Sequence, residues 1–148
     1  MTTATVEEIR LGPIAVRFLV EGAATGGSAA LFEFDVLEDT PAPPAHSHDS
    51  WEETIYGLRG TLTWTVDGIA REIGPGEVLC IPRGVVHSFE NLGAGTATQL
   101  AVVTPGVLGP DYFRDLAALV GADGPPDHAA MLDVMRRHGL TPEADGTS

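Results

Sequence analysis

Three histidines and one glutamate in this chain have the spacing of a metal site. His46 and His48 lie two residues apart, Glu53 follows five residues later, and His87 comes shortly after a Pro82-Arg83-Gly84 turn. Side chains two apart on a strand project from the same face, so His46 and His48 can direct neutral imidazole nitrogens at one point. A carboxylate beyond a short bend can join them, and the resulting donor set is typical of sites for divalent transition metals.

The donor set contains nitrogen and oxygen but no thiolate. That composition argues against a closed structural zinc site and favours Fe, Mn, Ni, Co, Cu or a catalytic Zn. In octahedral geometry, four protein ligands would leave two positions for water, O₂ or a small-molecule substrate. We therefore predict a cofactor of one divalent transition metal ion.

Of two adjacent glutamates, Glu53 is the expected ligand. In a strand that starts near this point, Glu53 shares a face with Ile55 and Gly57, whereas Glu52 falls on the opposite face. Gly57 on the ligand-bearing face either leaves space inside the fold or marks the close packing of a neighbouring strand.

The segments around these residues have the pattern of a β protein. From about residue 13 to residue 104, short β-prone runs alternate with turns rich in Gly, Pro and Asx, as in a sandwich or a barrel. Strands are expected at residues 14–20, 29–36, 53–58, 61–66, 77–81 and 96–103. Asp67-Gly68 predicts a two-residue hairpin, and Gly74-Pro75-Gly76 predicts another turn.

After Pro105 the apolar residues recur with the period of a helix. Two helical stripes are expected, over residues 113–120 and 131–135, with Asp127 placed to cap the second helix. We predict a β-barrel with an N-terminal strand over residues 1–104 and a helical extension over residues 105–148. The extension must bury its apolar stripes on the barrel or on a second subunit.

Composition narrows the range of partners. The chain has 148 residues and a net charge of −13 without a basic cluster, so the counterion release that drives nucleic-acid binding is missing. Its apolar runs are too short to span a bilayer, and its start lacks the features of a secretion signal. We therefore expect a cytoplasmic protein without nucleic-acid or membrane partners. The single cysteine, Cys80, fits a reducing compartment, and its apolar neighbours predict a small buried core residue.

The order and spacing of the candidate ligands resemble the two motifs of the cupin superfamily. The first motif corresponds to His46-Ser47-His48-Asp49-Ser50-Trp51-Glu52-Glu53 followed by Gly60, and the second to Gly76, Pro82, Gly84, His87 and Asn91. The fifteen residues between the motifs are similar to the short spacing of small microbial single-domain cupins. One departure is Thr40, which stands where the first motif often opens with glycine, at a position that carries no ligand.

This resemblance implies a fold and a ligand set. The fold is an all-β double-stranded β-helix, or jelly-roll barrel, to which the tail adds short C-terminal α-helices. The implied metal ligands are His46, His48, Glu53 and His87. Cupin relatives also imply a homodimer, formed by exchange of an N-terminal strand or by packing of sheet faces. The β-prone segment 2–10, which has no obvious partner before Pro13, is compatible with such an exchange.

The resemblance further implies a class of activity. Similar small cupins include flavonol-cleaving dioxygenases, which implies a dioxygenase-like oxidoreductase acting on an enolic or aromatic small molecule. Glu53 is then the expected catalytic residue, as ligand and general base together. A redox-inert metal would instead favour isomerisation or ring closure, as in cupins that resemble polyketide cyclases. A non-catalytic module that binds a metabolite is the third alternative.

Several further side chains have two interpretations. Trp51 either walls the mouth of a pocket or packs at its rim. Phe32 and Phe34 either line a ligand cavity or fill the core. Gln99 is a candidate for an inward-pointing polar group beside the substrate.

The remaining polar and aromatic candidates are given structural roles. Tyr56 and Trp64 are expected on the outside of their strands or at a subunit interface. Asn91 is expected to stabilise a turn rather than to bind metal. His128 and His138, in the tail, are expected to be surface or satisfied core residues.

Overall fold

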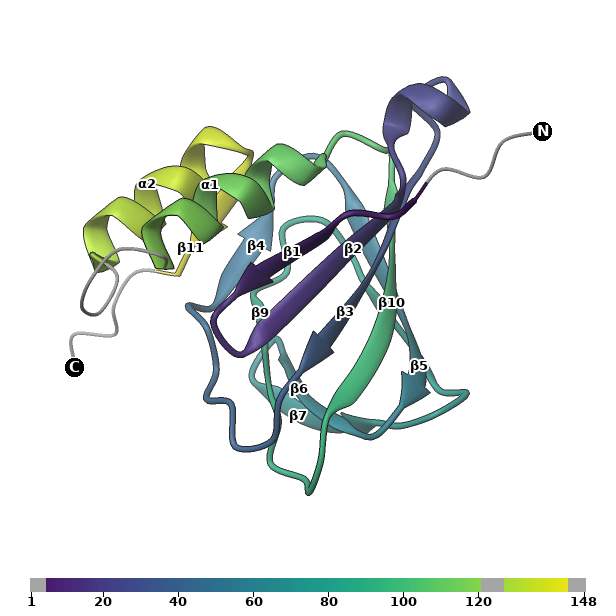
Figure 1. The fold of residues 1–148 in the computed structure, drawn as a ribbon, viewed down its shortest axis with the longest axis vertical. Helices are drawn as coiled ribbons and strands as arrows, with labels where there is room; N and C mark the ends of the chain where they lie inside the picture. Colours follow the sequence, from purple (N-terminus) through teal and green to yellow (C-terminus); the bar gives the residue numbers. More distant parts are fainter. Residues whose placement is uncertain (1–4, 121–126, 144–148) are drawn as a thin grey trace.

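The strands of this computed structural model, which describes residues 5–120 and 127–143, form two antiparallel sheets (Figure 1). The six-stranded sheet has the order β1 (Glu8–Leu11), β2 (Ile14–Val20), β3 (Ala30–Val36), β10 (Ala97–Thr104), β5 (Glu52–Arg59) and β8 (Val78–Ile81). The five-stranded sheet has the order β11 (Leu140–Pro142), β4 (His46–His48), β9 (His87–Glu90), β6 (Leu62–Val66) and β7 (Ile69–Ile73). This arrangement confirms the predicted all-β jelly-roll fold with short helices.

The two sheets enclose one apolar core because their strands alternate inward and outward side chains. In β3, Phe32, Phe34 and Val36 are buried while the residues between them are partly exposed. In the facing sheet, Leu62 and Trp64 of β6 are buried in the same way, and the ring of Trp64 lies edge-on to Phe34 at 6.4 Å between centroids.

The turns use the residues expected of them. Asp67 and Gly68 connect β6 to β7 with φ angles of 51° and 78°, the left-handed conformations that a tight hairpin requires. The side chain of Asn91 donates hydrogen bonds to the carbonyls of Val36 and Gly95, both at 3.0 Å. Asn91 therefore stabilises a turn, as predicted.

Gly57 sits where the backbone of β5 passes very close to the turn before β8. A Cβ atom added to Gly57 would lie 1.9 Å from the carbonyl oxygen of Gly74. The amide of Gly57 donates to the carbonyl of Glu77, and the amide of Gly76 donates to the carbonyl of Gly57, both at 2.9 Å. Of the two interpretations of Gly57, close packing is the correct one.

Two helices, α1 (Pro110–Val120) and α2 (His128–Arg137), pack against each other at one end of the barrel (Figure 1). Asp127 caps α2, as predicted, by accepting a hydrogen bond from the amide of Ala129 at 3.0 Å. Helix α1 contacts β1, and α2 contacts β11. Within the described ranges neither helix has the length and hydropathy needed to cross a membrane.

The tail also contains a strand that the sequence did not reveal. After α2, β11 pairs antiparallel with β4, so that Leu140 lies opposite His48 and Pro142 opposite His46. The chain between the helices, residues 121–126, and the last five residues lie outside the described part. The extension therefore reaches the five-stranded sheet beside the two histidines of β4.

Two expectations about individual residues were wrong. Cys80 is exposed, because β8 alternates and directs Leu79 and Ile81 inward. Trp64 is buried rather than facing outward. The N-terminal segment, for which no partner was expected before Pro13, finds one after it, since β1 pairs antiparallel with β2; residues 1–4 lie outside the described part.

Candidate metal centre

Strands β4 and β9 bring the three histidines of the two motifs together. His46 and His48 share one face of β4, and His46 lies directly opposite His87 in the antiparallel pairing of β4 with β9. One ring nitrogen of each histidine lies within 4.8 Å of one from each of the others. This histidine cluster (His46, His48 and His87) is therefore compact enough to share one ion.

Backbone carbonyls orient two of the imidazoles. The Nδ1 atom of His87 lies 2.9 Å from the carbonyl oxygen of Val85, and Nδ1 of His46 lies 3.1 Å from that of Pro44. Because a carbonyl only accepts, Nδ1 must carry a proton in both rings, so that Nε2 is the lone-pair nitrogen of each ring in its neutral form. Nε2 of His87 is buried and has no hydrogen-bond partner among the described residues. An unpaired buried acceptor of this kind fits a metal ligand.

Glu53 approaches the histidine cluster from the opposite sheet. Its Oε2 atom lies 3.5 Å from Nε2 of His48 and 3.7 Å from Nε2 of His87, and the residue is only 8% exposed. These separations exceed a hydrogen bond and leave room for a cation between the carboxylate and these two imidazoles, whereas the group of donor atoms that all lie within 4.8 Å of one another consists of the three histidines without Glu53. Glu52 points away and pairs instead with Arg83 at the surface.

Burial and neighbouring charges set the protonation of the site. Burial lowers the pKa of His46 to about 3, with a further contribution from the two other imidazoles, and burial lowers the pKa of His48 to about 4. Burial by itself raises the pKa of Glu53, but the surrounding imidazoles lower it by more, so its pKa falls below the usual range. At neutral pH His46 and His48 are therefore neutral and Glu53 is ionised, the protonation states that these residues need to bind a divalent cation.

Trp51 supports the site from behind. It is 1% exposed, and its indole stacks on the imidazole of His48 with 4.6 Å between ring centroids and 17° between planes. This contact fixes the orientation of His48 by packing. Trp51 therefore lies neither at the mouth nor at the rim of the cavity.

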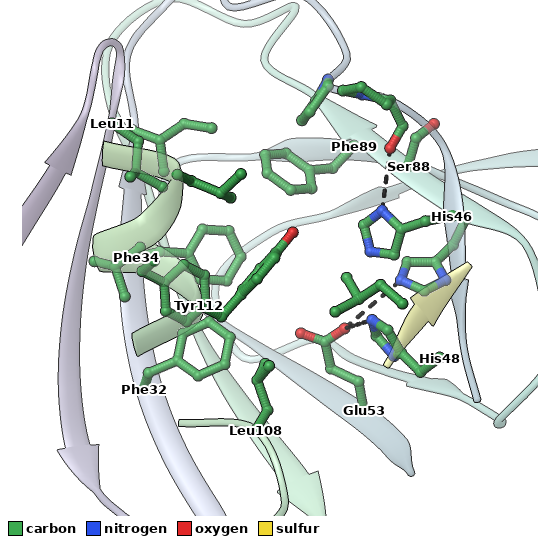
Figure 2. A pocket seen from close by; sticks show the side chains of 18 of the residues that line it. Leu11, Phe32, Phe34, His46, His48, Glu53, Ser88, Phe89, Leu108 and Tyr112 are labelled. Carbon is green, nitrogen blue, oxygen red and sulfur yellow. Dashed lines mark hydrogen bonds and ion pairs between the residues drawn. The ribbon is translucent and has the colours of Figure 1, made fainter. Parts of the chain in front are cut away.

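A cavity of about 130 Å³ opens beside the histidine cluster (Figure 2). Apart from the histidines and Glu53, its walls are largely apolar and come from both sheets and from the α1 region; they include Val16, Phe32, Phe34, Phe89, Leu108 and Phe113. No lysine or arginine lines it among the described residues. Phe32 and Phe34 thus combine their two interpretations, since they are core residues that also face the cavity.

Gln99 points inward, as suggested, but it does not line this cavity. Its Oε1 accepts from the indole nitrogen of Trp64 at 2.9 Å, and its Nε2 donates to the carbonyl of Ile73 at 2.8 Å. Both ends of the amide are occupied, so its role is to join the two sheets across the core.

The tail contributes to the cavity, a point that the sequence left open because the tail helices could either brace a subunit interface or cover the barrel mouth. Leu108, Tyr112, Phe113 and Leu116 line the cavity, and Tyr112 was not singled out. The signal for these residues is the amphipathic stripe of α1. That stripe indicated an apolar partner but could not indicate which surface it covers.

Acidification is expected to destabilise the metal-free protein between about pH 6.5 and pH 4. Folded His46 and His48 have pKa values of about 3 and about 4, whereas imidazoles in the unfolded chain titrate near 6.5. In this window the unfolded chain binds protons that the folded protein does not, so the free energy of unfolding falls as the pH falls. Urea titrations at pH 7 and pH 4.5 measure the drop. It should be smaller in His46→Gln, which cannot titrate, and an equal drop would contradict the assignment.

Comparisons with known proteins agree with this geometry. Residues 32–103 match the family described as the cupin domain. A quercetin 2,3-dioxygenase from Bacillus subtilis (strain 168) is 35% identical over 71 residues, which are 48% of this chain and 20% of that protein. A germin-like protein 1-1 from Oryza sativa subsp. japonica is 32% identical over 88 residues, 56% of this chain and 39% of that protein.

A solved structure extends the similarity over most of the chain. The polyketide cyclase RemF from Streptomyces resistomycificus is 28% identical, with a TM-score of 0.57, and the match covers 77% of this chain and 94% of that one. The fold, the two motifs and these matches together show that the chain contains a cupin domain, matched over residues 32–103. The chain spans less than half the length of the two curated relatives it matches.

Proposed function

We propose that this protein is a metal-dependent enzyme that acts on a small, planar and largely apolar molecule carrying an enolic or phenolic oxygen, in a dioxygenase-like reaction. The observation that carries this proposal is the cavity, whose walls are aromatic and aliphatic and whose polar end is formed by the histidine cluster and Glu53. Such a cavity suits a flat ring system with an oxygen directed at the cluster. Without a lysine or an arginine in its described lining, it is poorly suited to phosphorylated or polycarboxylate substrates.

The proposed metal ligands are His46, His48, Glu53 and His87. The unpaired Nε2 of His87 and the spacing of Glu53 from two imidazoles support this set. A divalent metal bound there would supply Lewis-acid polarisation of a substrate oxygen and, if redox-active, reactivity toward O₂. The protein holds its ligands from two facing sheets, which fixes their positions independently of any flexible loop.

Glu53 is the proposed proton acceptor. Its lowered pKa keeps it ionised at neutral pH, and its burial keeps bulk water away from the carboxylate. An ionised, desolvated carboxylate at the polar end of the cavity can accept the proton that an enolic hydroxyl loses when its oxygen is directed at the histidine cluster.

A second candidate function is ring closure or isomerisation without oxygen. The observation that favours it is the similarity to the polyketide cyclase RemF, which covers 77% of this chain, whereas the matched segment covers only 20% of the dioxygenase. The same apolar cavity would accommodate a folded polyketide-like chain. The two functions differ in their need for O₂.

An oxygen electrode separates these functions. Protein with a measured metal content is expected to consume O₂ in step with the loss of quercetin, and removal of the metal with a chelator should abolish both. Conversion of a polyketide-like substrate without O₂ uptake would instead support the cyclase-like function. Binding without turnover of either compound would indicate a metabolite-binding protein and overturn the enzymatic proposal.

The homodimer and the cytoplasmic location stay predictions. In support of a second subunit, the outer face of the six-stranded sheet exposes Tyr56, Leu58 and Val78, which are 41%, 42% and 60% exposed. Light scattering of the purified protein measures the oligomeric state.

A further inference from the structure

Tyr112 is the one tyrosine among the described residues that line the cavity. It belongs to the first turn of α1, outside the segment that matches the cupin family, and it is 7% exposed. Figure 2 shows its ring rising from the apolar wall and its hydroxyl projecting into the cavity on the side that faces the imidazoles. A polar group thus enters from the wall opposite the proposed metal ligands.

The hydroxyl of Tyr112 has no hydrogen-bond partner within residues 5–120 and 127–143. Apart from the proposed ligands, the described lining has three polar side chains, those of Tyr112, Ser88 and Trp64. The indole nitrogen of Trp64 already donates a hydrogen bond to Gln99, so only the hydroxyl groups of Tyr112 and Ser88 are left for a ligand. The residue Tyr112 as a whole is buried, but its hydroxyl is not among the unpaired polar atoms that are cut off from solvent. A hydroxyl that opens into a cavity and makes no hydrogen bond there is available to a ligand.

We propose that Tyr112 is a substrate-binding residue, which donates a hydrogen bond to an oxygen of an enolic substrate while a second oxygen of that substrate is directed at the histidine cluster. The inference rests on the proposed function, and it narrows the substrate class to planar molecules with two neighbouring oxygens, such as an enol beside a ketone. It also assigns a role to the C-terminal extension, since the hydroxyl comes from α1 and not from the barrel.

The surroundings of Tyr112 hold its ring in place. The ring packs edge-on against Phe113 at 5.1 Å and against His138 at 5.4 Å between centroids. His138, just after α2, lies 2.8 Å from the carboxylate of Asp115 on α1, so the two helices are tied together next to Tyr112. A side chain fixed in this way loses little conformational freedom when a ligand binds.

Tyr112 also keeps its proton. Burial, together with the negative charge of Glu53, raises the pKa of Tyr112 well above its ordinary value. The hydroxyl therefore keeps its proton at neutral pH and can donate a hydrogen bond.

The test is a comparison of two ligands and three proteins. The ligands are 3-hydroxychromone, a bicyclic enol with a neighbouring ketone, and naphthalene, a bicyclic ring system without oxygen. The proteins are the wild type, Tyr112→Phe and the matched control Tyr56→Phe, whose hydroxyl-bearing side chain is 41% exposed on the outer face of β5. Kd values are measured for each protein, both metal-free and loaded with Zn²⁺, which is redox-inert.

Tyr112→Phe is expected to weaken 3-hydroxychromone binding about tenfold, because one hydrogen bond is lost. Naphthalene binding should change less than about twofold, since the aromatic wall remains, and Tyr56→Phe should change neither. Equal weakening of both ligands would show a merely structural effect, and unchanged 3-hydroxychromone binding would show that the hydroxyl has no part; either result overturns the proposal.

Failure of the proposed function would look different. If the wild type binds 3-hydroxychromone in neither form, the substrate class is wrong and this inference falls with it. If binding depends on Tyr112 but is the same with and without Zn²⁺, the role of Tyr112 stands and the proposed role of the metal is wrong.

Discussion

Replacing His87 by alanine is expected to remove most of the bound metal. His87 contributes one of four proposed donors, and its Nε2 is buried, unpaired and oriented by the carbonyl of Val85. Loss of an oriented ligand should weaken metal binding by at least about 100-fold, since loss of a supporting outer-shell group alone costs about 10- to 100-fold. Elemental analysis of the purified variant measures the occupancy, and a competition titration measures the affinity. The control is His128→Ala, which removes a histidine at the start of α2, outside the cluster.

The adjacent glutamates provide a second matched pair for the same prediction. Glu53→Ala should lose metal as His87→Ala does, because the carboxylate faces two of the imidazoles. Glu52→Ala should keep the metal, because Glu52 pairs with Arg83 at the surface. Full occupancy in both His87→Ala and Glu53→Ala would refute the ligand set, and metal loss in Glu52→Ala alone would mean that the wrong glutamate was chosen.

The ligand candidates were readable from the sequence because strands impose a period of two. His46 and His48 had to share a face wherever that strand ran. The same parity agreed with the choice of Glu53 over Glu52, which the resemblance to the cupin motif gave through the distance to Gly60. The structure confirms both choices of face, since the two histidines join one cluster and only Glu53 is buried. The hairpin at Asp67 and the cap at Asp127 were predictable for a similar reason, because each depends on local backbone geometry.

The alternation of side chains along a strand could not show which face is buried where residues on both faces are apolar. Cys80 lies between Leu79 and Ile81, so its neighbours suggested a core position, yet those neighbours are the inward residues and Cys80 alternates outward on an edge strand. The prediction for Trp64 was wrong in the opposite sense, because this residue was expected to face outward and is buried. Its indole nitrogen needs a buried partner to be placed inside, and that partner, Gln99, lies on a distant strand.

The sequence identified the tail as helical, but it could not show which surface the helices pack against. Its apolar stripe has the right period, while the strand that follows it has only three residues and ends in proline. The pairing of β11 with β4 depends on the path of the whole extension. The position of Tyr112 in the cavity depends on the same path, which is why a residue outside the family motifs escaped notice.

Replacing Gly57 by alanine is expected to destabilise the protein by about 3–5 kcal/mol, or to prevent folding. The added Cβ would lie 1.9 Å from the carbonyl oxygen of Gly74, a distance that no side-chain rearrangement can relieve because both groups belong to the backbone. Moving the strands apart would break the two hydrogen bonds that Gly57 makes with Glu77 and Gly76. Urea titration followed by circular dichroism measures the free energy of unfolding.

The control for this substitution is Gly109→Ala. Gly109 has no atom within 4 Å of an added Cβ, so alanine there should leave stability unchanged or raise it slightly by restricting the unfolded chain. Gly57 and Glu53 lie on the same face of β5, so a displaced strand should also lower metal affinity in any Gly57→Ala protein that does fold. Equal denaturation midpoints for the two variants would mean that β5 and the turn at Gly74 are not in contact. In that case Glu53 would lack the backbone anchor that holds it opposite the histidine cluster.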